Sequence, residues 1–153
     1  MNELPLHPAI VHFPIAFALL VPFLGAGFLI WTRENDSLVQ QVLRVPLVLQ
    51  AVTVIAGFVA QRTGDEEHHQ VEEFVERGLI NEHEEASELF FIACIVTLLA
   101  WFAAAAAKEP DLARKAAIIA VVLGLVTAAL GIRAGEMGGE LVYIHGAAEA
   151  WKP

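Results

Sequence analysis

Six histidines are the residues of this 153-residue chain whose types could support chemistry at a site. Imidazole ligates haem iron and suits zinc, copper and non-haem iron, and it titrates close to neutral pH. One of the six lies within an apolar segment, where an ionisable side chain is costly and tends to mark function. The alternative there is a simple hydrogen bond to a neighbouring helix. In chain order they are His7, His12, His68, His69, His83 and His145.

The surroundings of the histidines favour some of them as ligands over others. His68 and His69 lie among carboxylates, which is typical of a solvated acidic surface. Glu66 and His69 have the Glu-x-x-His spacing of di-iron bundles, but a single such pair is a weak signal. We therefore take four histidines as candidate cofactor and metal ligands: His7, His12, His83 and His145.

Two arginines extend this candidate site. Arg62 and Arg133 each stand where an apolar segment ends, on the same side as the histidines. They could bind haem propionates or another anion, or they could simply reach for the membrane surface. Nothing in the chain matches a nucleophile with its base, a phosphate-binding loop or a nucleotide-binding motif. An electron carrier or binding protein is therefore a better expectation than a catalyst.

The composition indicates the elements that must position these side chains. Hydrophobic residues make up 57% of the chain, mean hydropathy is +0.60, and acidic residues outnumber basic ones 18 to 9. These values exclude a disordered chain and a binder of nucleic acid through a basic surface. The single cysteine, Cys94, excludes an intrachain disulfide.

Four apolar segments are close to the length of about 20 residues that a bilayer requires. We predict an all-α, four-transmembrane-helix bundle with a short C-terminal fold-back segment, forming one domain over residues 1–153. The expected spans are about 9–31, 43–62, 82–107 and 115–133. The first segment is too long for a cleaved signal peptide, and Met1–Pro8 contains no Lys or Arg.

Local signals predict how the segments begin and end. Pro8 suits a first helical position, and Pro14 deprives the Ile10 carbonyl of its amide partner, which favours a bend. Asn81 with Glu84 has the spacing of an N-cap that starts the third helix, and residues 65–77 could form a separate surface helix. Four glycines between Gly131 and Gly139 favour a turn that returns His145 over the bundle end.

The charge distribution predicts the orientation in the membrane. Four spans place both termini and all six histidines on one side. The two loops on the other side, residues 33–44 and 108–115, carry five of the nine basic residues and four of the 18 acidic ones. Basic residues in short loops remain in the cytoplasm. We therefore expect a bacterial inner-membrane protein with both termini in the periplasm.

Two sequence motifs resemble a known family. Residues 6–14 read LHPAIVHFP, and residues 138–146 read GGELVYIHG. Together with the overall layout they resemble the bacterial membrane family catalogued as domain of unknown function 2231, over nearly the whole chain. That family has no assigned activity to transfer. Members fused to Rieske or cytochrome-type domains imply a link with electron transfer.

Three hypotheses remain open from the sequence. The first is a b-type haem protein with two axial imidazoles, Arg62 and Arg133 at the propionates, and redox partner proteins at the outer face. The second is a non-haem copper, zinc or iron site formed by the same histidines. The third is a cofactor-free structural membrane subunit. The sequence leaves open whether the chain forms a homo-oligomer.

Overall fold

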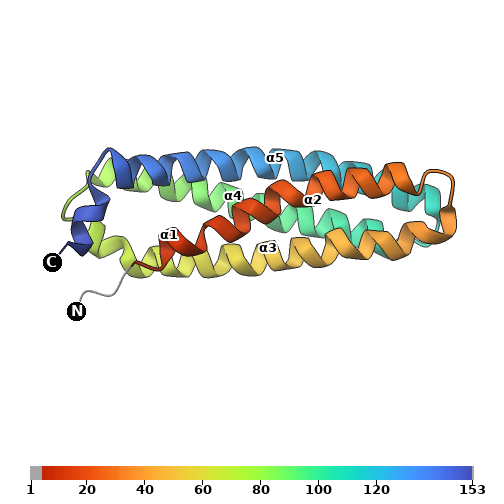
Figure 1. Cartoon of the computed structure of the whole chain (residues 1–153), viewed down its shortest axis with the longest axis horizontal. Helices are drawn as coiled ribbons and strands as arrows, with labels where there is room; N and C mark the ends of the chain where they lie inside the picture. Colours follow the sequence, from red (N-terminus) through yellow and green to blue (C-terminus); the bar gives the residue numbers. More distant parts are fainter. Residues whose placement is uncertain (1–4, 153) are drawn as a thin grey trace.

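The computed structural model describes residues 5–152 as a bundle of long antiparallel helices (Figure 1). A short helix α1 precedes the four long ones, and a 3₁₀ turn, η1, follows them. Their bounds are α1 His7–Ile10, α2 His12–Trp31, α3 Asp36–Val71, α4 Arg77–Ala106, α5 Pro110–Tyr143 and η1 Ala147–Trp151. The predicted all-α bundle is confirmed.

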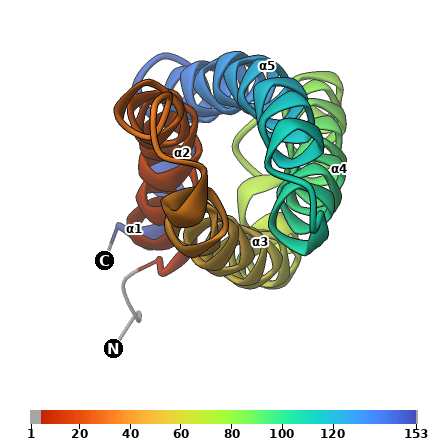
Figure 2. The same ribbon diagram turned by 90° about the vertical axis from the view of Figure 1, so that its right-hand side faces the viewer.

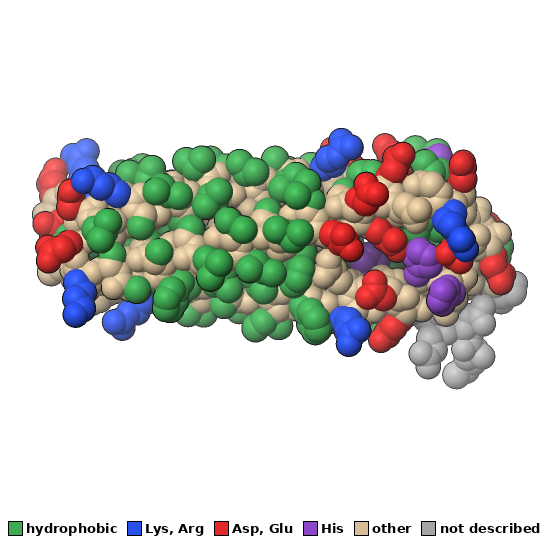
Figure 3. All heavy atoms as spheres, turned by 180° about the vertical axis from the view of Figure 1, so that it is seen from behind, with side chains coloured by type: hydrophobic (Ala, Val, Ile, Leu, Met, Phe, Trp, Pro, Cys, Tyr) green, Lys and Arg blue, Asp and Glu red, His purple; other side chains and the backbone are tan. Residues whose placement is uncertain are grey.

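Four helical segments of the described chain are long and apolar enough to cross a membrane: His7–Trp31, Asp36–Val71, Arg77–Ala106 and Pro110–Tyr143. Their hydrophobic side chains form a broad band around the middle of the molecule, and the charged side chains lie at its two ends (Figure 3). This is the surface of a protein whose middle is surrounded by lipid.

Helices α3, α4 and α5 are longer than the hydrocarbon core of a bilayer is thick. At 1.5 Å per residue the 36 residues of α3 extend over about 54 Å, whereas the hydrocarbon core is about 30 Å. The excess lies at the end that holds the termini, where α3, α4 and α5 carry their acidic residues. We call this the outer end, after the orientation that the charge distribution predicts, and the end with the loops after Trp31 and Ala106 the inner end.

The four long helices form a ring in end-on view (Figure 2). Helix α2 packs against α3 and α5, and α4 also packs against α3 and α5. Helices α2 and α4 are therefore diagonal to each other across the bundle axis. A side chain that joins them must cross that axis.

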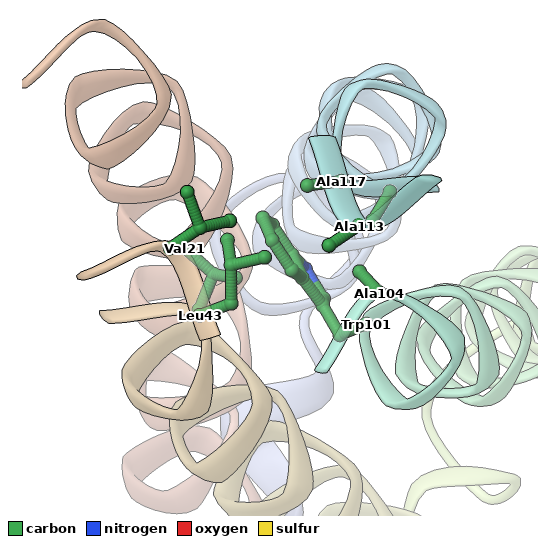
Figure 4. Close-up of a cluster of buried hydrophobic side chains, with 8 residues drawn as sticks. Val21, Leu43, Trp101, Ala104, Ala113 and Ala117 are labelled. Atoms are coloured by element: carbon green, nitrogen blue, oxygen red, sulfur yellow. The ribbon is translucent and has the colours of Figure 1, made fainter. Parts of the chain in front are cut away.

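Trp101 of α4 crosses the axis in the inner half (Figure 4). Its side chain is fully buried in one cluster with Val21, Leu43, Ala113 and Ala117. A Cβ added at Gly25 of α2 would lie 2.3 Å from Trp101 Cη2, so the indole fits only because Gly25 has no side chain. The indole and the small residues around it close the axis at this level.

Buried hydrogen bonds join the helices in the middle of the bundle. The hydroxyls of Thr97 in α4 and Thr127 in α5 lie 2.8 Å apart. Gln50 of α3 donates through Nε2 to the Cys94 carbonyl of α4 at 3.0 Å. Such bonds satisfy polar groups that would otherwise be stranded in hydrocarbon.

Two predicted helix boundaries are wrong. Residues 65–77 do not form a separate surface helix, because α3 continues to Val71 and only residues 72–76 connect it to α4. Helix α4 begins at Arg77 rather than at Asn81. The reason is burial: Val75 and Ile80 pack with Leu141 and Ala147 in a small core at the outer end.

The predicted turn in the glycine-rich segment is also wrong, since α5 is continuous to Tyr143. The glycines are sites of close helix approach instead. A Cβ at Gly131 would lie 2.8 Å from Phe90, and one at Gly138 would lie 3.0 Å from the His83 ring. The fold-back starts later, at Gly146, whose φ of 82° lies in the left-handed region that favours glycine.

The first span has a short interruption close to Pro14, where a bend is expected. The first span is interrupted at Val11, which separates α1 from α2. Pro14 has no N–H to donate to the Ile10 carbonyl, and the next bond, from Ile15 N to the Val11 carbonyl, is long at 3.5 Å. Val11 itself keeps right-handed helical angles, φ −58° and ψ −24°, and both α1 and α2 pack against α3.

Candidate metal centre

His7 is held at the start of α1 by the outer part of α3. The Glu67 carboxylate accepts hydrogen bonds from the backbone N–H groups of Leu6, at 2.6 Å, and His7, at 3.1 Å. These are N–H groups that a helix start leaves without intrahelical partners. The first turn of the chain is thereby fixed to α3 at one carboxylate.

The His7 ring is oriented by α3 as well. Its Nδ1 lies 2.8 Å from the Ala60 carbonyl oxygen, and because a carbonyl only accepts, Nδ1 carries the proton and donates. The ring rests on Gly64, where an added Cβ would lie 3.1 Å from Cε1. Nε2 is left with its lone pair, which is the arrangement usual for an imidazole that ligates a metal.

His83 of α4 is held in a similar way by α5. Its ring rests on Gly138, where an added Cβ would lie 3.0 Å from Cε1. Its Nδ1 is buried and has no hydrogen-bond partner in the described structure. A buried imidazole nitrogen without a partner is uncommon and calls for an explanation.

The two rings lie close together in an edge-on arrangement. Their centres are 6.2 Å apart, and their planes meet at 75°. Two imidazoles that share one metal ion at metal–nitrogen distances of about 2.0–2.1 Å have ring centres roughly 6 Å apart. The pair therefore has the separation that one shared ion requires.

A second polar cluster joins α3 to α4 beside this pair. His68 contacts Glu72 through Nε2 at 2.7 Å and Glu84 through Nδ1. Arg77 reaches the other oxygen of Glu72 at 3.3 Å. The hydrogen bond from His68, together with the charge of Arg77, lowers the pKa of the Glu72 carboxyl. Glu84 follows His83 directly, so the cluster braces the turn that carries the buried ring.

The structure brings together two of the predicted site residues, His7 and His83, and keeps the other four outside. His12 is exposed on the outer surface of α2, and His145 is exposed after the end of α5. Arg133 is exposed too, and Arg62 lies over the Phe58 ring at 5.7 Å from its centre. Among the described residues, no group of three or more His, Cys, Asp and Glu side chains is arranged to hold a metal ion.

Sequence reasoning missed the residues that seat the two rings. Glu67, Gly64 and Gly138 contact or flank His7 and His83, and no local motif marks them. The spacing of Gly64 from Glu67 on α3, less than one helical turn, is the signal that could have grouped them on one face.

Comparison with known proteins agrees with this membrane fold. Residues 3–150 match the family described as predicted membrane protein, DUF2231. The chain belongs to this family. The match covers nearly all of the sequence, including both motifs that carry the resemblance and both opposed histidines of the DUF2231 bundle. No curated protein and no solved structure matches the chain.

Proposed function

We propose that this DUF2231 protein binds one transition-metal centre between His7 and His83 at the outer end of its bundle. The observation that carries the proposal is the opposed pair of imidazoles, 6.2 Å between centres, with an Nε2 lone pair on one side and an unpartnered Nδ1 on the other. Glycines seat both rings, so the pair is preorganised for a ligand on the axis.

Haem b with a role in electron transfer is the first candidate. A porphyrin supplies four nitrogens to its iron, so two protein imidazoles complete the coordination. The protein would contribute two such donors from different helices, His7 from α1 and His83 from α4, as bundle cores that hold cofactors do. Arg62 and Arg133 stand at the same end of the molecule and could reach propionates from their exposed positions.

A copper, zinc or non-haem iron ion is the second candidate. It is favoured by the close seating of the rings, since a Cβ added at Gly64 or Gly138 would lie only 3.1 or 3.0 Å from Cε1 of the adjacent ring. The 6.2 Å between the ring centres is close to the separation of two imidazoles that share one ion. Solvent or a small molecule would then fill the remaining coordination positions, as in open metal sites.

The location of the site supports a partner in the aqueous phase outside the membrane. His7 and His83 belong to the end of the bundle that holds the termini and most of the acidic residues. The histidine side chains visible in Figure 3 lie at this end, and the loops with five of the nine basic residues lie at the other. By the positive-inside rule the basic end is cytoplasmic. We propose a bacterial inner-membrane protein with both termini periplasmic and with redox partner proteins on that side.

The test is the absorption spectrum and metal content of the detergent-purified protein from cells supplied with haem and metals. A Soret band with sharp reduced α and β bands is expected for haem. His7→Gln and His83→Gln should each reduce the bound centre at least tenfold, as loss of a ligand does, while the exposed His12→Gln and His145→Gln variants serve as matched controls.

Three results are possible, and each decides something. Loss confined to the His7 and His83 variants, with a Soret band, supports haem. The same pattern with stoichiometric metal and no Soret band supports the non-haem centre. A colourless, metal-free protein, or equal loss in all four variants, contradicts the proposal.

A further inference from the structure

An apolar groove crosses the surface between α3 and α4 near the inner end of the bundle. Its volume is about 340 Å³, and it is lined by Arg44, Leu47, Val48, Phe102, Ala105 and Ala106. Val48 and Phe102 at its edges are 59% and 61% exposed. Because these residues belong to the apolar band, the groove opens toward lipid.

Arg44 is the one charged residue in the lining of this groove. At the inner end Arg33 pairs with Glu34, Arg114 with Asp36 and Lys115 with Asp111. Arg44 forms no ion pair within the part of the chain that the structure describes, and its side chain is exposed. An exposed guanidinium at the end of an apolar groove is a ready donor to an anion, with the planar fork that fits phosphate.

The depth of Arg44 matches the boundary between lipid tails and headgroups. One turn nearer the helix end, Gln40 of α3 donates through Nε2 to the carbonyls of Ala107 and Lys108, at 2.8 and 2.7 Å. These bonds join α3 to the C-terminal end of α4, where the chain leaves the lipid and enters the aqueous phase. The groove starts directly beneath them, so its charged end lies at headgroup level and its apolar part extends into the tail region.

We infer that this groove binds an anionic phospholipid, with the lipid phosphate on Arg44 and one acyl chain against Leu47, Phe102 and Ala106. Charge complementarity selects the occupant, because the loops around the groove carry more basic than acidic residues, five against four, and Arg44 is left without a partner. A free phosphate would leave the apolar lining uncovered, whereas a lipid fills both parts. This site is independent of the proposed metal centre at the opposite end.

Native mass spectrometry of the full chain from mixed micelles, with equal phosphatidylglycerol and phosphatidylcholine, tests the headgroup. The wild type should retain phosphatidylglycerol several-fold over phosphatidylcholine. Arg44→Gln should bring the ratio close to one. Arg33→Gln removes the same charge from the loop outside the groove and should leave the ratio unchanged. No preference in the wild type, or equal effects of the two variants, overturns the inference.

A second pair of variants tests the groove itself. Ala106→Phe fills the lining without touching the charge, and since Ala106 is exposed the helix tolerates the ring. Retained lipid should fall several-fold. Ala103→Phe places the same ring on an exposed position of α4 outside the groove and should have no effect. If Ala106→Phe lowers the fraction of dimer instead and leaves lipid retention unchanged, a second copy of the chain occupies the groove and the inference is wrong.

Discussion

His68 contacts two carboxylates at once, Glu72 through Nε2 and Glu84 through Nδ1. A neutral imidazole has one N–H donor, so both contacts are hydrogen bonds only when the ring is an imidazolium. A charged ring between two carboxylates therefore braces α3 against α4 next to His83. The stability that these contacts contribute is therefore expected to depend on pH.

The lowered pKa of Glu72 sets the direction of that dependence at acid pH. A carboxyl with a lowered folded pKa contributes stability that is full above its ordinary value of 4.5 and is lost as the pH falls through the folded value. We expect the unfolding midpoint of the wild type to drop more steeply below about pH 4.5 than that of Glu72→Gln. Thermal unfolding in detergent between pH 7 and pH 3 measures this.

Glu73→Gln is the matched control, because Glu73 is the exposed neighbour of Glu72. Glu73→Gln should show the same dependence of the unfolding midpoint on pH as the wild type. If the unfolding midpoints of the wild type and Glu72→Gln fall in parallel as the pH is lowered, the contacts between Glu72 and His68 contribute nothing to stability.

The candidate site could be predicted from the sequence in its residue types but not in its pairing. His7 and His12 are five positions apart, so they point about 140° apart on a helix and only one can face the axis. The apolar neighbours of His12 indicated that His12 would be the residue facing the axis. In the structure His7 lies next to His83, and His12 is exposed. The choice depends on Gly64 and Glu67, which are more than 50 residues away in sequence, so no local pattern reveals it.

At the scale of elements, the spans could be predicted and their ends could not. Apolar length identifies the part of each helix that lies in lipid, and all four are present. The polar ends of α3, α4 and α5 remain helical because they pack on one another outside the membrane, at Val75, Ile80 and Leu141. Composition alone predicts loops for those segments, because the contacts that stabilise them as helices are tertiary and leave no local pattern.

Close approach between diagonal helices gives a prediction for α2. Gly25→Ala would place a Cβ 2.3 Å from Trp101 Cη2, so the indole or the helix must shift. We expect a loss of roughly 1–3 kcal/mol in unfolding free energy, the usual cost of overfilling a close-packed core. Chemical or thermal unfolding of the purified protein measures it.

Gly27→Ala is the control on the same helix, because nothing lies within 4 Å of the added Cβ. It should be neutral, or stabilising by about 0.4–1 kcal/mol through the unfolded state. Equal effects of the two substitutions would mean that Trp101 does not occupy the axis beside Gly25.

At the scale of the whole molecule, the two ends differ in charge and in length beyond the membrane. This difference predicts that Asp111 and Glu149 are exposed on opposite sides of the membrane. Asp111 lies at the inner end, and Glu149 lies in η1 at the outer end. In a Cys94→Ser background, a membrane-impermeant maleimide added to intact bacterial cells with a permeabilised outer membrane should label Glu149→Cys and not Asp111→Cys. Labelling of Asp111→Cys alone reverses the orientation, and labelling of both contradicts a fixed topology.

The buried Trp101 blocks the movement of solutes along the bundle axis. Its indole, with Val21, Leu43 and the alanines of α5, fills the axis of the inner half (Figure 4). The only polar side-chain atom of this cluster is the buried indole Nε1, which has no hydrogen-bond partner in the described structure. Solutes and ions therefore have no aqueous route along this axis from the inner end to His7 and His83. A ligand of the proposed centre at those histidines would therefore have to enter and leave at the end of the bundle that holds the termini.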